Sequence, residues 1–413
     1  MAHGRVRDRA RSLVAASLLV ALGACGGGGG GSSGGGGGSS GGGGGDAIGG
    51  SGPNVQPIYV NAGSTGDYVN GVFTSVTICV PGTSTCQTID GLLVDTGSEG
   101  LRLVSSAITI PLPAQSLGGS ALVECNQFQD SYQWGPVLSA DVRIGGEQAS
   151  SVPIQSVGNA AFDVPSACTS SGLPPENTAS DLGANGILGV GLFRQDCGPA
   201  CALTGSRNPG LYFACSGSRC TAAAVPVEQQ VQNPVWLFSG DNNGVIVQLP
   251  AIGATGVPGA AGSLIFGIGT RSNNGLGSAA VYRTDDIGNI TTTYQGKPYP
   301  KSFIDSGSNG LFFLDAATSA ISTCRDNDSF YCPPTTTTLT ATNQGQGGSA
   351  VSVSFSVANA NVLFNSPNYA FSNLGGPNAG AFDWGLPFFY GRNVYTAIEL
   401  QTTPGGTGPY FAY

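Results

Sequence analysis

The sequence predicts an all-β protein made of two related lobes. Short apolar runs rich in β-branched residues recur along the chain between Gly, Pro, Asn and Ser, as in VFTSVTICV (72–80) and GVIVQLP (244–250). Charged residues make up only 9% of the 413 residues, against roughly a quarter in ordinary soluble domains. One motif also occurs twice, as LLVDTGS (92–98) and SFIDSGS (302–308). Strands and turns should therefore build most of the folded chain, in two similar halves.

Residues 1–24 are predicted to be a secretory signal peptide. Four Arg near the N-terminus precede an apolar run, 13–22, that is too short to span a bilayer stably. The ending Leu22-Gly23-Ala24-Cys25 resembles the lipobox of bacterial lipoproteins, which implies cleavage before Cys25 and a lipid anchor on that Cys. Gly26 stands where an inner-membrane retention signal would show Asp, which favours the outer membrane of the cell envelope, facing the periplasm or the outside. An ordinary signal peptide with a chance Cys is the alternative.

Residues 25–53 are predicted to be the lipidated Cys and a flexible linker. The stretch 26–45 contains only Gly and Ser, so it buries no apolar area and behaves as a coil with a reach of about 25 Å. The folded part should begin near Pro53. We expect an N-terminal β lobe over 54–272 and a C-terminal β lobe over 273–413, each long enough for its own core.

Charge and histidine content exclude several functions. The signal peptide holds four Arg and Asp8, so 11 of 15 basic and 23 of 24 acidic side chains remain in the mature chain. Such an acidic domain argues against nucleic acid as a partner. The sole histidine, His3, lies in the signal peptide. The mature protein therefore cannot use a Ser-His-Asp triad, a Cys-His pair or His-ligated zinc, and we predict no metal site and no cofactor.

The cysteines predict disulfides. Eleven Cys minus the lipidated Cys25 leave ten, an even number in an exported protein. Plausible pairs are Cys79–Cys86, Cys197–Cys201, Cys215–Cys220 and Cys324–Cys332, which would leave Cys125 with Cys168. The alternative is a zinc site built from Cys197, Cys201, Cys215 and Cys220. It is disfavoured because thiols oxidise in the periplasm and because these spacings are not a usual zinc pattern.

Each copy of the repeated motif combines an apolar strand with a tight loop. The Gly after each Asp lets the backbone approach its symmetry mate, which a Cβ would obstruct. The hydroxyl residue directly after each Asp can bond across the interface between the loops, and the Ser after each Gly can bond the outer oxygen of the preceding Asp. The residues in these supporting roles are Thr96, Gly97, Ser98, Ser306, Gly307 and Ser308.

With these motifs the chain resembles the pepsin-like aspartic peptidases. Each Asp loop is followed by an apolar segment ending near Gly, NGILGVG (185–191) and FDWGLPFF (382–389), and GSLIFG (262–267) and YTAI (395–398) look like further strands of that fold. The resemblance implies a bilobal fold with a cleft between two related β lobes. Together with the lipobox and the Gly/Ser linker, the pattern also resembles a family of bacterial lipoproteins that carry paired Asp-Thr/Ser-Gly-Ser motifs.

The resemblance implies that Asp95 and Asp305 form one catalytic pair. Two carboxylates in contact cannot both ionise cheaply, so they share a proton and can activate a water for peptide hydrolysis. We expect a membrane-tethered endopeptidase, monomeric, with a polypeptide in its cleft. The alternative is a non-catalytic lipoprotein that holds a protein or other ligand in the same cleft. A purely structural envelope lipoprotein would have no deep cleft.

Two features depart from the peptidase pattern. Glu99 and Arg102 follow the first motif where a hydroxyl and later an aromatic residue are usual, and Glu99 is either a carboxylate that affects the Asp pair or a solvated loop charge. The flap that covers substrate normally carries a Tyr. Here Tyr132 and Trp134 are the flap candidates, neither a clean match, and Trp134 is the better candidate for a packing role.

Overall fold

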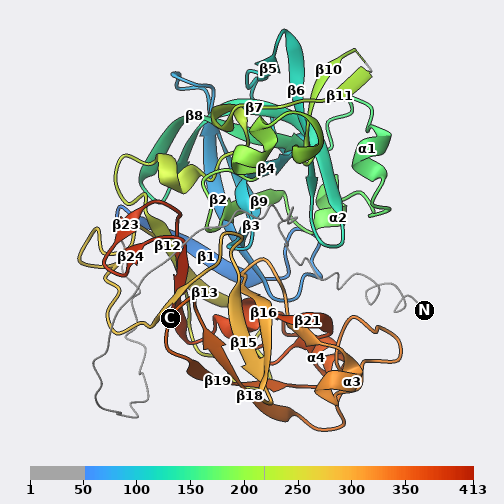
Figure 1. The fold of residues 1–413 in the computed structure, drawn as a ribbon, viewed down its shortest axis with the longest axis vertical. Coiled ribbons are helices and arrows are strands. Elements are labelled where there is room, and N and C mark those ends of the chain that lie inside the picture. The colour runs from blue at the N-terminus through green and yellow to red at the C-terminus, as the bar shows by residue number, and fades with distance from the viewer. Residues whose placement is uncertain (1–51, 218) are drawn as a thin grey trace.

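The computed structural model describes residues 52–217 and 219–413 (Figure 1). Strands account for 45% of the residues and helices for 11%, so the prediction of an all-β protein is confirmed. The predicted signal peptide 1–24, the lipidation site Cys25 and nearly all of the linker 25–53 lie outside the described residues. Among the described residues, no helix has the length and apolar character needed to cross a membrane.

The larger sheet has 16 strands and contains a closed ring. β2 pairs with both β3 and β7, so the path from β7 through β8, β4, β9 and β3 returns to its start. β5 (Ser116–Leu117) adds to β6 at the side. The strands along the sheet are β11 (Arg219–Ala222), β10 (Tyr212–Ser216), β6 (Ser120–Gln127), β7 (Tyr132–Ile144), β8 (Glu147–Val157), β4 (Glu99–Val104), β9 (Gly186–Val190), β3 (Cys86–Asp95), β2 (Gly71–Cys79), β1 (Val55–Asn61), β13 (Ala260–Phe266), β12 (Gly244–Leu249), β22 (Arg392–Ala397), β25 (Tyr410–Ala412) and β14 (Val281–Arg283).

The second sheet has seven strands and lies at the lower end of Figure 1. Its strands, in order, are β19 (Val351–Val357), β18 (Thr337–Gln344), β15 (Ile290–Tyr294), β16 (Lys297–Ile304), β21 (Asn378–Trp384), β17 (Leu311–Leu314) and β20 (Gly375–Gly376). A small hairpin joins β23 (Thr402–Thr403) and β24 (Gly406–Thr407). The helices are all short: α1 (Ser166–Thr169), α2 (Ala179–Leu182), α3 (Ala316–Ser319), α4 (Ala360–Phe364), and the 3-10 turns η1 (Ser105–Ala107), η2 (Gly198–Ala202), η3 (Gly205–Arg207), η4 (Val227–Gln229), η5 (Pro234–Leu237) and η6 (Leu386–Phe388).

One arrangement of three strands occurs in both halves of the chain. In the first half, β9 runs parallel to β3 and antiparallel to β4. In the second half, β21 runs parallel to β16 and antiparallel to β17. β3 and β16 are the apolar strands that lead into the repeated Asp motif, while β9 and β21 come from the later segments 185–191 and 382–389. The strand that leads into each Asp loop therefore pairs with a later strand of its own half.

Strands from both ends of the chain share the middle of the large sheet. β1 pairs with β13, β13 with β12, and β12 with β22 near the C-terminus. In Figure 1, β1 and β13 lie between the upper strands β6–β8 and the lower strands β15, β16 and β21. The sheet thus continues across the expected boundary between 272 and 273, and the largest hydrophobic cluster takes residues from both sides of it.

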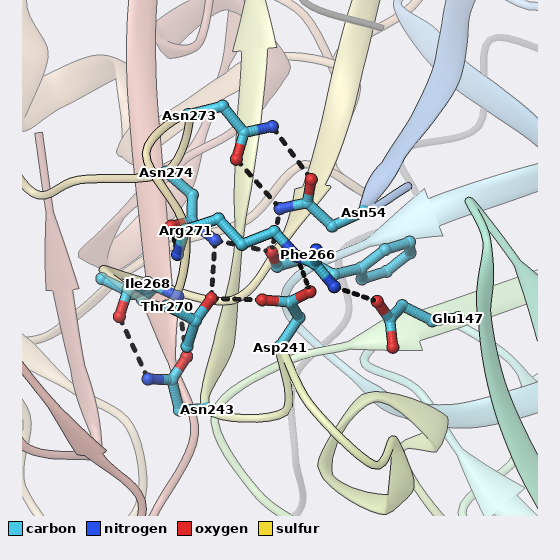
Figure 2. Close-up of polar contacts among 10 residues, drawn as sticks. All are labelled: Asn54, Glu147, Asp241, Asn243, Phe266, Ile268, Thr270, Arg271, Asn273 and Asn274. Carbon is cyan, nitrogen blue, oxygen red and sulfur yellow. Dashed lines mark hydrogen bonds and ion pairs between the residues drawn. The ribbon is translucent and has the colours of Figure 1, made fainter. Parts of the chain in front are cut away.

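A polar network fastens the end of β13 to the turn between β7 and β8 (Figure 2). Asp241, which is 3% exposed, accepts hydrogen bonds from the side chains of Thr270 and Arg271. Arg271 also pairs with Glu147 at 3.5 Å. Asn54, at the start of the described chain, donates to the carbonyl of Phe266 at 2.8 Å. Buried polar groups with partners of this kind fix the relative positions of the segments that carry them.

The ten remaining cysteines form five disulfides, with the pairing that the sequence suggested: Cys79–Cys86, Cys125–Cys168, Cys197–Cys201, Cys215–Cys220 and Cys324–Cys332. The four cysteines of the alternative zinc site are thus bonded to one another as two disulfides. Their sulfurs are not available as thiolate ligands.

Candidate active site

The loops after β3 and β16 meet face to face in the interior. Asp95 is 2% exposed and Asp305 is fully buried. A Cβ built on Gly97 would stand 2.6 Å from the carboxyl carbon of Asp305, and one built on Gly307 would stand 2.6 Å from Oδ1 of Asp95. Real Cβ atoms do not approach so closely, so each loop needs glycine where the opposite carboxyl comes near. The structure thereby brings together two aspartates that are 210 positions apart in the sequence.

Each carboxyl is also held by its own loop. One oxygen accepts from the backbone N–H of the following Gly, and the other accepts from the hydroxyl of the Ser after it. These bonds are Gly97 N to Asp95 Oδ1 (2.8 Å), Ser98 Oγ to Asp95 Oδ2 (2.5 Å), Gly307 N to Asp305 Oδ1 (2.7 Å) and Ser308 Oγ to Asp305 Oδ2 (2.7 Å). With both oxygens engaged, the carboxyl planes are fixed, and the donors stabilise negative charge on either aspartate.

The hydroxyl residues after the two aspartates lock the loops to each other. The backbone N–H of Ser306 donates to Thr96 Oγ1 at 2.9 Å, and the N–H of Thr96 donates to Ser306 Oγ at 3.1 Å. The Ser306 hydroxyl in turn donates to the carbonyl of Val94 at 2.7 Å. Thr96 and Ser306 are buried, so these bonds are shielded from water and set the distance between the aspartates.

The contact between the carboxyls favours a shared proton. Burial raises the pKa of Asp305, and the neighbouring carboxyls of Asp95 and Asp383 raise it further, whereas the hydrogen bond from Ser308 lowers it. Asp95 and Asp305 are close enough for a hydrogen bond between their side chains. Because two negative carboxylates in contact repel each other strongly, the Asp305 carboxyl holds its proton more tightly.

Two cavities open beside the first Asp loop, and both are lined by Gly97, Glu99 and Phe193. The first, of about 320 Å³, extends from Ser98 toward η2 and the disulfide-bonded Cys197. The second, of about 260 Å³, extends toward loops of the second half of the chain, including residues 287–289 and 378–381. The aspartate loop therefore lies where these two hollows meet.

Glu99 and Arg102, the departures from the peptidase pattern, are both buried, so Glu99 is not a solvated loop charge. Arg102 forms ion pairs with Glu124 at 2.7 Å and with Asp196 at 2.9 Å, and it donates to the carbonyl of Glu99 at 2.7 Å. The Glu99 carboxyl accepts from the N–H of Phe193. Burial raises the pKa of Glu99, and Asp95 and Asp196 raise it further. Arg102 thus acts as an internal counter-ion behind the first Asp loop.

The two flap candidates are core residues of the β6–β7 hairpin. Trp134 is 2% exposed, packs edge-on against Phe213 at 5.3 Å between ring centroids and donates from its indole N–H to a backbone carbonyl. Tyr132 is 6% exposed and belongs to the same cluster. Within the described chain neither lines the two cavities. The hairpin residues that do so include Phe128 and Gln129, at the turn, which sequence reasoning missed because they form no recognisable flap motif.

Sequence reasoning also missed Asp383, a third carboxyl beside the pair. Asp383 lies on β21 and is 1% exposed. Burial raises its pKa, as does the charge of Asp95, while the nearby Ser308 hydroxyl lowers it. The signal in the sequence was an acidic residue inside the apolar segment FDWGLPFF. The equivalent strand of the first half, β9, contains only apolar residues and glycine.

Comparison with protein families identifies the family described as "Protein of unknown function (DUF3443)". It matches residues 50–413, which include every residue of the candidate active site. No curated protein matches the chain.

Proposed function

The chain belongs to the DUF3443 family, and we propose that it is an aspartic endopeptidase that hydrolyses peptide bonds with Asp95 and Asp305. The observation that carries this proposal is the reciprocal contact of the two loops, in which each carboxyl lies against the glycine of the other. Two adjacent buried carboxyls destabilise the fold, because they repel each other and lose hydration. A catalytic role would explain why the chain carries such a pair.

The proposed fold is the bilobal fold of pepsin-like peptidases, with the active site between two related lobes. The three-strand arrangement that occurs in both halves supports this proposal, because it places one Asp loop in each half in the same way. The two cavities beside the first Asp loop support a cleft, since they are lined by residues from both halves of the chain.

The proposed reaction uses the pair in its singly protonated form. The ionised carboxyl takes a proton from a water molecule bound between the two aspartates, and the oxygen of that water attacks the peptide carbonyl carbon. The protonated carboxyl gives its proton to the carbonyl oxygen, which yields a tetrahedral diol. The carboxyl that took the proton from water gives it to the amide nitrogen, while the other carboxyl, now ionised, takes a proton from one hydroxyl of the diol. The C–N bond then breaks and releases an acid and an amine, and the pair is again singly protonated. No covalent intermediate and no cofactor are required.

The proposed substrate is an extended polypeptide that crosses the first Asp loop. The two cavities lie beside this loop and share Gly97, Glu99 and Phe193, so side chains next to the scissile bond would enter them. Phe128 and Gln129, at the turn of the β6–β7 hairpin, would cover the chain. An extended peptide rises about 3.3 Å per residue and alternates its side chains, which suits two separate hollows.

The test is hydrolysis of an unfolded protein between pH 3 and pH 7 by the wild type, Asp95→Asn and Asp305→Asn. Each variant should lose at least about 100-fold in rate, because general acid–base catalysis contributes that much or more. The exposed Asp326 provides the control Asp326→Asn, which should keep full activity. Folding is checked by thermal unfolding. A wild type that binds an unfolded polypeptide without cleaving it would instead support the non-catalytic binding lipoprotein.

We propose further that a lipid on Cys25 holds the protein on the bacterial cell envelope. The lipobox-like sequence before Cys25 and the Gly/Ser linker after it support this localisation. Metabolic labelling with a fatty acid, followed by membrane fractionation, tests it. Cys25→Ser should lose the label and move to the soluble fraction, and a labelled Cys25→Ser variant would contradict the proposal.

A further inference from the structure

Asp383 occupies a position at which the first half of the chain has an apolar residue. The strand registers give the equivalence: Phe303 on β16 lies opposite Asp383 on β21, as Leu93 on β3 lies opposite Ile187 on β9. Ile187 is fully packed in a hydrophobic cluster. The three-strand arrangement therefore does not require a carboxyl at this position, and the second half carries one where an apolar side chain would serve the fold.

The surroundings of Asp383 make that carboxyl costly. Its register neighbours Phe303 and Phe312 are apolar, and it is 1% exposed. Among the described residues, neither oxygen of its side chain has a hydrogen-bond partner of normal geometry. A buried carboxyl without hydrogen-bond partners strongly destabilises a fold in its charged form. Such groups persist mainly where they serve function.

Asp383 is connected to the catalytic pair through Ser308. The Ser308 hydroxyl donates to Asp305 at 2.7 Å, and it also lies close enough to Asp383 to lower the pKa of that carboxyl. The segment after Asp383 holds the backbone of the same serine, because the N–H of Leu386 donates to the carbonyl of Ser308 at 2.7 Å. The titratable groups that face Asp383 are Asp305, from the loop after β16, and Asp95, from the loop after β3.

We propose that Asp383 is a positioning residue that makes the environments of the two aspartates unequal and extends the shared-proton state of the pair toward neutral pH. This inference rests on the proposed function. The asymmetry follows from the comparison of the halves: Asp305 has a third carboxyl behind its serine, whereas Asp95 has Ile187 at the equivalent position. Once Asp383 ionises, its negative charge disfavours loss of the shared proton, so the pair then stays singly protonated to a higher pH. For an enzyme in a near-neutral compartment, that extension widens the working range.

The test compares the pH profiles of kcat/KM for the wild type, Asp383→Asn and Asp383→Ile. Asn keeps the shape and polarity but removes the charge, and Ile reproduces the first half of the chain. We expect the upper limb of the profile to move to lower pH by about one unit in both variants, while activity at the acidic optimum falls less than tenfold. The exposed Asp326→Asn serves as the control with an unchanged profile. An upper limb that stays in place in both variants overturns the inference.

A second readout does not depend on activity. A carboxyl whose pKa is raised in the folded state binds its proton more tightly there than in the unfolded chain. The free energy of unfolding therefore falls as the pH rises from the unfolded-state pKa, about 4, toward the folded-state pKa. Asp383→Asn should therefore lose less thermal stability than the wild type between pH 4 and pH 7. An identical loss in the two proteins would also overturn the inference. A wild type without hydrolytic activity refutes the proposed function, whereas an active wild type with unaltered Asp383 variants refutes the inference alone.

Discussion

Gly307 lies so close to Asp95 that a Cβ on Gly307 would stand 2.6 Å from Oδ1 of that aspartate. The contact is matched on the other side by Gly97 and Asp305. Neither glycine has a positive φ, so space and not backbone conformation is what requires glycine here. The distance between Asp95 and Asp305 therefore depends on the lack of a side chain at both glycines.

The first prediction concerns this close approach. Gly307→Ala should separate the loops, lower the free energy of unfolding by about 1–3 kcal/mol, as overpacked cores do, and abolish the proposed activity. Gly275 offers a matched control, because it is exposed and a Cβ there would meet no atom within 4 Å. Denaturant unfolding and hydrolysis assays measure both effects. Full activity in Gly307→Ala would show that the pair does not need this spacing.

The second prediction concerns the bonds between the loops. Ser306→Ala removes the acceptor of the Thr96 N–H and the donor to the Val94 carbonyl. A buried N–H without a partner costs about 1–3 kcal/mol, so the free energy of unfolding should fall by about that amount. Activity should fall as well, because the aspartates lose their fixed separation. The control is Thr340→Val, whose hydroxyl is exposed and contacts only Ser354 among the described side chains. Equal stability losses in both variants would contradict the locking role.

Much of the site could be predicted because its determinants are local. An apolar run followed by Asp, a hydroxyl residue, Gly and Ser specifies a strand, a tight loop and the donors to the carboxyl, and its repetition indicates that two such loops are paired. The disulfides were predictable for a similar reason: four of the five join cysteines at most eight positions apart, which leaves one remaining pair.

The missed features depend on distant pairing. Asp383 becomes a neighbour of the aspartates only through the register of β21 with β16, which the letters FDWG do not reveal. The flap candidates failed to line the cavities for a related reason. Tyr132 and Trp134 were selected by residue type. The residues that reach the cavities are instead decided by the position of the hairpin turn, which contains Phe128 and Gln129.

The third prediction compares two disulfides. Cys125–Cys168 closes a loop of 43 positions between β6 and α1, whereas Cys197–Cys201 closes one of only 4. Loop-closure entropy gives about 4 kcal/mol for the longer loop and about 2 kcal/mol for the shorter one. Replacing both cysteines of the longer loop by Ala should therefore lower the free energy of unfolding more than the same change in the shorter loop. Denaturant titrations of the two double variants decide it, and the reverse order would refute the entropic account.

The last prediction concerns the polar network of Figure 2. Burial raises the pKa of Glu147, as does its contact with Asp241, and Arg271 counteracts both effects. Without Arg271, the pKa of Glu147 should rise further, because the Glu147 carboxyl would lie beside Asp241 without a neighbouring cation. A raised folded-state pKa lowers stability as the pH increases above the pKa of Glu in the unfolded chain, about 4.3. The stability lost on removal of Arg271 should therefore be small at pH 4 and larger at pH 7.

Arg271→Gln should accordingly lower the melting temperature at pH 7 and lower it less at pH 4. Arg325 is exposed and makes no ion pair among the described residues, so Arg325→Gln is the control and should melt like the wild type at both pH values. Thermal unfolding of the three proteins at the two pH values measures the effect. If Arg271→Gln lowers the melting temperature equally at pH 4 and pH 7, the arginine stabilises this network by packing alone. The charges of Asp241 and Glu147 would then contribute nothing to the attachment of β13 to the β7–β8 turn.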